Sequence, residues 1–234
     1  TVKTEHDFPF KASAMLYFRD IRKACKAVVM FSKMTDKAGN RIVKGAELLD
    51  KKSLSSVNDT TGEGLTAILT EVKGNSPEEL AEHIAEITKS LENYELAVPV
   101  YFTDKEEEYS KYWAIRSGIF PSVGGTRPPG TTCLIEDVAF HIQDLPEAVA
   151  DLQDLMEKHG YHDACIYGHS LEGNFHFIIN QSFDTEQEIQ RYENLMNDVI
   201  ALVVDKYDGS LKAEHGTGQN MAPFVEYEWG KEAF

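Results

Sequence analysis

The chain has 234 residues, of which 42% are hydrophobic, enough to bury a substantial core in one large domain or two small ones. Its 39 Asp and Glu residues against 23 Lys and Arg residues give a formal charge of −16. A field of this sign repels phosphate backbones, so the composition argues against a nucleic-acid partner.

No apolar run approaches the roughly 20 residues that span a bilayer, so we expect no transmembrane segment. The amino end (TVKTEHDFPF) has neither the basic nor the apolar region of a signal peptide. Cys25, Cys133 and Cys165 are widely spaced in apolar surroundings, which predicts buried thiols rather than disulfides or an iron–sulfur site. Together these features predict a cytoplasmic chain, with a parent protein that is either free or peripheral to the inner membrane.

The first half alternates between strand-like and helix-like patterns. Residues 10–18 predict a strand, Asp20 starts a helix, and 42–49 predict a second strand followed by a short helical or turn segment. Residues 65–73 predict a third strand, Ser76–Glu79 form a capping box, 95–102 predict a fourth strand, and 105–120 a helix. The order is βαββαβ with one trailing helix.

The second half repeats this order. A strand at 131–142 precedes a helix that starts near Asp144, and two strands at 163–169 and 174–180 are joined by a tight turn. Asp184 with Gln187 caps a long helix, 210–215 predict the last strand, and a helix-like tail follows Gly218.

The repeated order predicts an α+β fold of two ferredoxin-like units, whose antiparallel sheets carry helices packed on one side. We expect the units to cover residues 1–119 and 120–234, with the Gly- and Pro-rich stretch 120–132 as their joint. The halves share no obvious residue identity, so the duplication is one of structure.

Two histidines flank the predicted turn of the second half. In a hairpin centred between Glu172 and Gly173, residues whose numbers sum to about 345 face each other, which pairs His169 with His176. Directly opposed side chains have Cβ atoms roughly 4.5 to 5.5 Å apart, so two imidazoles could reach one metal ion. The alternative is a pair of hydrogen-bonded histidines in the core. Without a third ligand, two histidines favour this alternative.

A third ligand candidate follows in KAEHGTG (212–218). Glu214 completes a two-histidine, one-carboxylate set suited to zinc or another divalent first-row metal. His215 is then a candidate general base, because imidazoles titrate near neutral pH. Adjacent residues of a regular strand point to opposite faces, so both can serve one site only if the strand end twists.

Arg116, in the segment YWAIRSGIF, is a candidate for gripping a substrate carboxylate with two parallel hydrogen bonds. The alternative is a surface ion pair, which composition alone favours, and Arg127 is a weaker candidate of the same kind. The remaining histidines show no partner pattern and are assigned to the surface: His6, His83, His141, His159 and His162.

These motifs in their order resemble a known family. The chain carries Arg116 in a WxxR segment, an IEDVAF strand, the hairpin GHSLEGNFH and the strand end EHGTG. The set is similar to the carboxy-terminal substrate, or cap, domain of FAD-linked oxidases of the vanillyl-alcohol-oxidase superfamily. That group includes D-lactate, glycolate and D-2-hydroxyglutarate dehydrogenases. The IEDVAF version is most similar to large bacterial members fused to an iron–sulfur module.

The resemblance implies a flavin enzyme that oxidises a small 2-hydroxy acid. It implies that His169, His176 and Glu214 bind the divalent metal, that His215 takes the hydroxyl proton as hydride leaves for FAD, and that Arg116 binds the carboxylate. Nothing in the chain resembles the FAD-binding domain, so we expect FAD to be held by a missing domain and this chain to be inactive alone.

The chain departs from the family at substrate-contacting positions. Leu171, Ile178, Phe120 and Ile135 stand where relatives carry small or polar residues. The departures favour a substrate other than a dicarboxylate. Two alternatives stay open: a ferredoxin-like ligand-binding module without catalysis, and the cap of a metal-free flavin alcohol oxidase.

Overall fold

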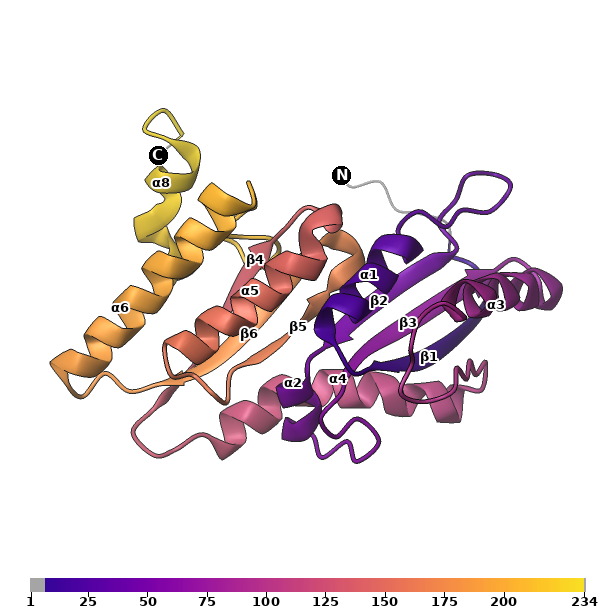
Figure 1. Ribbon diagram of the computed structural model, residues 1–234, viewed down its shortest axis with the longest axis horizontal. Coiled ribbons are helices and arrows are strands. Elements are labelled where there is room, and N and C mark those ends of the chain that lie inside the picture. Colours follow the sequence, from indigo (N-terminus) through magenta and orange to yellow (C-terminus); the bar gives the residue numbers. More distant parts are fainter. Residues whose placement is uncertain (1–6, 234) are drawn as a thin grey trace.

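The computed structural model describes residues 7–233, in which all the strands join one antiparallel sheet in the order β1-β3-β2-β5-β6-β4. The strands are β1 (Phe10–Phe18), β2 (Val43–Leu49), β3 (Thr66–Gly74), β4 (Thr132–Ala139), β5 (Cys165–His169) and β6 (Asn174–Gln181). Each half of the chain contributes three neighbouring strands (Figure 1). The halves meet where β2 pairs with β5, through the pairs Glu47↔His169, Leu48↔Gly168 and Leu49↔Tyr167.

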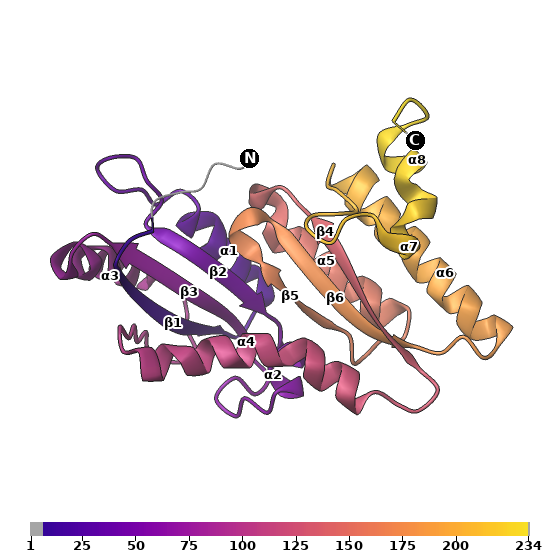
Figure 2. The ribbon, with the colours of Figure 1, turned by 180° about the vertical axis from the view of Figure 1, so that it is seen from behind.

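Helices cover both faces of the sheet. One face carries α1 (Ile21–Phe31), α3 (Pro77–Leu91), α5 (Leu145–Lys158) and α6 (Glu186–Ile200), which pack on the larger hydrophobic core. The other face carries α2 (Lys51–Ser56) and α4 (Glu106–Thr126), and α4 crosses the strands of the first half (Figure 2). A π-helical turn (Ala201–Lys206) extends α6, and the short helices α7 (Gly218–Met221) and α8 (Val225–Trp229) end the chain.

Alternating side chains on the strands explain the two cores. On β1, Leu16 and Phe18 belong to the larger core, whereas Met15 and Tyr17 belong to the core beneath α4. Because the side chains of a strand point alternately to opposite faces, a sheet covered on both sides needs apolar residues at nearly every position. The sequence 10–18 meets this requirement, and the predicted strand there is confirmed.

The predicted fold class is confirmed as α+β with an antiparallel sheet, but each unit has three strands rather than four. The units share one sheet, and helices cover both of its faces rather than one side. The predicted strand at 95–102 is wrong, because this segment touches β1 only through the isolated bridges Phe18↔Leu96 and Ser13↔Thr103. Pro99 lies between these bridges and has no N–H for a continuous ladder. The predicted strand at 210–215 is also wrong, since only Ser210 bridges, to Ala139.

Two helix boundaries also differ from the prediction. Helix α4 continues through Pro121 to Thr126, so the first part of the predicted joint is helical. Ile119 and Val123 of this helix pack into the core beneath it, and this burial outweighs the hydrogen bond that proline removes. Helix α6 is capped by Thr185, whose side chain accepts from the N–H of Glu188, and not by Asp184.

Two histidine assignments are wrong. The side chain of His159 is only 11% exposed, and its Nε2 lies 2.8 Å from Oδ2 of Asp198. His83 is buried, and its Nδ1 lies 3.0 Å from the carbonyl oxygen of Lys73, so an apolar helix face accommodates a polar ring with a satisfied nitrogen. His6 lies outside the described residues. Within residues 7–233, no helix combines the length and the hydrophobicity that crossing a bilayer requires.

Candidate functional site

The predicted site residues gather on the α4 face of the sheet, close to the β2–β5 junction. His176 pairs with Tyr167 across the β5–β6 ladder, so the predicted pairing of His169 with His176 is wrong by two residues. The cause is the turn, which is a 3₁₀ turn (Ser170–Glu172) closed by Gly173 at φ 72° rather than a two-residue turn.

The error in register leaves the two histidines on one face. A shift of two residues preserves the face to which a side chain points, whereas a shift of one reverses it. The rings of His169 and His176 have centroids 5.9 Å apart and lie nearly perpendicular, at 86°. The two histidines therefore lie close together as predicted, although the predicted strand register was wrong.

Glu214 joins the two histidines. Its Oε1 lies 3.2 Å from Nε2 of His169 and 3.1 Å from Nε2 of His176. The three ligand atoms of this group lie within 4.8 Å of one another, so one ion could contact all of them. Two imidazole nitrogens and a carboxylate oxygen form a donor set that zinc and other first-row divalent metals accept.

The far side of each imidazole meets a carboxylate. Nδ1 of His169 lies 2.6 Å from Oε1 of Glu47, and Nδ1 of His176 lies 3.2 Å from Oδ1 of Asp137. Histidines that bind metals usually have their second ring nitrogen on a carboxylate or carbonyl, which fixes the ring and the tautomer. These partners direct both Nε2 atoms toward Glu214, and the residues present fit a divalent metal.

Both supporting carboxylates keep a low pKa although they are buried. Burial raises the pKa of Glu47, but the hydrogen bond to His169 and the charges of His169 and Arg116 outweigh it, so the pKa is lowered. Burial would also raise the pKa of Asp137, but the close contact with His176 and the hydrogen bonds from three backbone N–H groups outweigh it, so this pKa is lowered too. The hydrogen bond to Glu47 raises the pKa of His169.

Glu214 and His215 lie in an irregular segment rather than a strand. Oδ2 of Asp137 accepts the backbone N–H groups of Ala213, Glu214 and His215, at 2.9, 2.6 and 2.9 Å. Because the backbone curves around this oxygen, both adjacent side chains reach the same site. The ring of His215 stacks on that of His176, with centroids 4.6 Å apart and planes at 5°.

Arg116 reaches the site from α4. Its Nε donates to Oε2 of Glu47 at 3.0 Å, and its Cζ lies 5.0 Å from the centre of the Tyr167 ring. The bond uses Nε rather than the terminal amino groups. Arg127 does not reach the site, because its Nη1 and Nε bind the carbonyl oxygens of Gly124 and Thr131.

A second group of possible ligands shares His176 with the first. Asp137, His176 and His215 also offer ligand atoms within 4.8 Å of one another. Asp137 is already occupied, since Oδ2 takes three backbone N–H groups and Oδ1 accepts from Asn174. The set with Glu214, whose side chain is half exposed, is therefore better suited to bind an ion.

Sequence reasoning missed Glu47 and Asp137. Their partners lie far away along the chain, at His169 and His176, so no local spacing could pair them. One signal was present: each is a charged residue inside an apolar strand, and buried charges in proteins are rarely unpaired.

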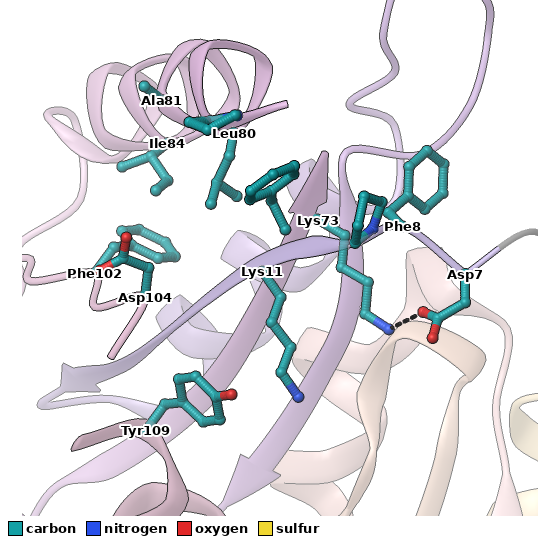
Figure 3. A pocket seen from close by; sticks show the side chains of 13 residues that line it. Asp7, Phe8, Lys11, Lys73, Leu80, Ala81, Ile84, Phe102, Asp104 and Tyr109 are labelled. Atoms are coloured by element: carbon teal, nitrogen blue, oxygen red, sulfur yellow. Dashed lines mark hydrogen bonds and ion pairs between the residues drawn. The ribbon is translucent and has the colours of Figure 1, made fainter. Parts of the chain in front are cut away.

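A cavity of about 680 Å³ opens at the β1 edge of the sheet, next to the start of α3 (Figure 3). Its rim includes Lys73, whose Nζ lies 2.9 Å from Oδ1 of Asp7. The described residues that line this cavity include no predicted site residue. A smaller cavity of about 320 Å³ is bordered by His215 and Asp137 and adjoins the site.

Comparison with known proteins gives a family match over nearly the whole chain. Residues 9–234 match the family model described as FAD linked oxidases, C-terminal domain. The glycolate oxidase subunit GlcD of Bacillus subtilis (strain 168) is 24% identical over 190 residues, covering 80% of this chain and 39% of that protein. The D-2-hydroxyglutarate dehydrogenase of Xanthomonas citri pv. viticola is 23% identical over 118 residues, covering 50% of this chain and 24% of that protein.

Solved structures show the same fold. The 4-ethylphenol oxidase from Gulosibacter chungangensis superposes with a TM-score of 0.59 at 11% identity, covering 94% of this chain and 49% of that chain. At this identity the likeness concerns the fold alone. The chain spans well under half the length of the curated relatives described above.

Proposed function

Because the chain belongs to the family of FAD-linked oxidase C-terminal domains, we propose that it is the substrate- and metal-binding domain of a flavin-dependent dehydrogenase. The proposed substrate is a 2-hydroxy acid similar to D-lactate. Two relatives are named for glycolate and D-2-hydroxyglutarate, which are both 2-hydroxy acids. The observation that carries the proposal is the convergence of two imidazole nitrogens on one oxygen of Glu214, at 3.2 and 3.1 Å.

His169, His176 and Glu214 are the proposed metal ligands. Three protein ligands are the usual number in catalytic zinc sites, where a further position serves water or substrate. A bound divalent ion would act as a Lewis acid on the substrate hydroxyl. Zinc is the first candidate, and other first-row ions accept the same donors.

His215 and Arg116 are the proposed substrate-handling residues. His215 stacks on the proposed ligand His176 and has an exposed side chain, so its ring can approach a hydroxyl held at the metal. It would take the hydroxyl proton as general base. Arg116 would bind the carboxylate of the substrate through its terminal amino groups, while its Nε stays on Glu47.

The proposed partner is an FAD-binding domain. FAD would accept the hydride from the substrate carbon, and this chain would orient the substrate and move the proton. The whole chain is the proposed substrate domain, with the ligand motifs in its second half, 120–234. The IEDVAF strand supports an iron–sulfur module in the parent protein, and such a cluster would take its ligands from outside this chain.

Metal analysis tests this proposal. The purified chain should carry about one divalent ion after zinc loading and desalting, and His176→Ala should lose it because two ligands hold an ion far more weakly than three. His162→Ala is the control, since the side chain of His162 is exposed and its ring pairs with Glu157. A folded wild-type chain that retains no ion would refute the metal centre and favour the metal-free alternative.

A further inference from the structure

Asp137 is a buried carboxylate that contacts His176 and the backbone of Glu214 and His215. Its side chain is 4% exposed. One oxygen, Oδ2, accepts three consecutive backbone N–H groups, and the other, Oδ1, lies 3.2 Å from Nδ1 of His176. Among the described residues, Asp137 is the side chain that both accepts the N–H of Glu214 and pairs with His176.

We propose that Asp137 is a positioning residue that brings Glu214 and His215 to the same side of His176. This role rests on the proposed metal centre and adds a residue to it. Asp137 binds no substrate and no metal in this scheme, and it acts through the residues it holds.

The backbone of the segment explains why such a residue is needed. After Ser210 the chain leaves the sheet, so the N–H groups of residues 213–215 have no strand partner. Unpaired N–H groups are costly when they are shielded from water, and successive N–H groups that converge form a concave site for an anion. A carboxylate oxygen at that point fixes the path of the backbone and thereby the direction of both side chains.

The two oxygens of Asp137 perform different tasks. Oδ2 shapes the segment that carries Glu214 and His215, whereas Oδ1 faces His176 and accepts from Asn174. An asparagine at 137 has a single acceptor oxygen, so it can serve the segment or His176 but not both. Asp137→Asn therefore removes one of the two tasks with almost no change in volume.

Binding of Co²⁺ by the chain, followed by its visible absorption, is the test. We expect Asp137→Asn to weaken Co²⁺ binding about 10- to 100-fold, the range found when residues supporting metal ligands are removed. Glu136→Gln is the matched control, because Glu136 is the neighbouring residue of β4, is equally buried and binds Asn220 instead. It should leave Co²⁺ affinity unchanged within about twofold.

A chemical rescue distinguishes positioning from general damage. In Asp137→Ala, added formate can occupy the place of the missing carboxylate, and Co²⁺ affinity should recover with saturation in formate. Formate should have no effect on the Glu136→Gln variant. A folded Asp137→Asn chain that binds Co²⁺ as the wild type does would overturn the proposal.

Hydrogen exchange of the wild-type chain provides a measurement that needs no variant. The amides of residues 213–215 should exchange more slowly than those of 216–219, because Asp137 holds them. Equal exchange rates would overturn the role of Asp137 while leaving the metal centre intact. If the wild type binds no Co²⁺ but shows the protection, the metal centre fails and the positioning role fails with it.

Discussion

Nδ1 of His169 lies 2.6 Å from Oε1 of Glu47, its direct partner across the β2–β5 ladder. The other oxygen of Glu47 accepts from Nε of Arg116 at 3.0 Å, and the side chain of Glu47 is 7% exposed. One buried carboxylate therefore joins a proposed metal ligand to the proposed substrate-binding arginine.

Replacing this carboxylate should weaken the metal centre. We expect Glu47→Gln to lower the affinity for zinc about 10- to 100-fold, because the ring of His169 loses an anionic partner that orients it and raises its basicity. Isothermal titration with zinc measures the effect. Glu71→Gln is the control, since Glu71 lies on the adjacent strand β3 and pairs with Lys73. Equal affinities for the two variants would contradict the supporting role of Glu47.

The same pair should give the metal-free chain a pH-dependent stability. The pKa of His169 is raised above its ordinary 6.5, so its contribution is fully present below that pH and is lost as the pH rises through the folded pKa. The pKa of Glu47 is lowered from 4.5, so its contribution is present above pH 4.5 and is lost as the pH falls through the folded pKa.

Urea unfolding of wild type and Glu47→Gln from about pH 4 to about pH 8 tests this expectation. The difference between the two proteins should be largest between pH 4.5 and 6.5 and should shrink above that range. A difference that does not shrink above pH 6.5 would show that the charge of His169 adds nothing, which leaves packing and the ion pair of Glu47 with Arg116.

The turn between the two histidines should tolerate no side chain at Gly173. A Cβ there would lie 2.0 Å from the carbonyl oxygen of Phe140, and this backbone atom cannot move aside without distorting β4. Gly216→Ala is a matched control, with a similar positive φ of 69° and open space around it. We expect Gly173→Ala to cost about 1 to 3 kcal/mol more than the control and to lower zinc affinity. Thermal unfolding and zinc titration measure both effects.

Arg116→Ala should impair substrate use in the full-length flavoprotein. Charged hydrogen bonds contribute about 1.5 to 3 kcal/mol, so kcat/KM for D-lactate or a related 2-hydroxy acid should fall roughly 10- to 100-fold. Arg127→Ala is the control and should behave as the wild type, because Arg127 donates to the carbonyl oxygens of Gly124, at the end of α4, and of Thr131. An Arg116→Ala enzyme with unchanged kinetics would assign Arg116 to a purely structural pair with Glu47.

His215→Ala should separate catalysis from metal binding. Because His215 is outside the proposed ligand set, the variant should keep its metal while kcat falls about 10²- to 10⁴-fold, the usual contribution of a general base. Metal analysis and steady-state kinetics of the full-length protein measure the two properties. Loss of the metal would favour the alternative ligand set with Asp137, and unchanged turnover would favour a domain without catalysis.

Local sequence patterns predicted most helices and strands correctly. They failed where an element depends on a neighbouring strand that is distant in the sequence. The caps at Asp20 and Ser76 follow from side chains within three residues, and both are present. The segments 95–102 and 210–215 have strand-like composition, but a strand exists only where a neighbour offers a continuous ladder. Composition carries no information about that neighbour.

The sequence predicted that His169, His176 and Glu214 lie together, because the two histidines flank one turn and the order of motifs is informative. The carboxylates behind them were not predicted, since Glu47 and Asp137 meet their histidines through the tertiary structure. The turn between the histidines shows a further limit: a 3₁₀ turn and a two-residue turn need the same glycine at position 173. Only the ladder itself distinguishes them.

The strand pairing at the junction of the halves has a consequence for folding. Three residue pairs join β2 to β5, and one of them contains both Glu47 and His169. His169 is held by Glu47 only when the two halves are docked. An ion that needs His169 in this position therefore binds the docked state, and part of its binding free energy stabilises the docking of the halves. The halves already share both hydrophobic cores, so loading the ion should further stabilise their docking.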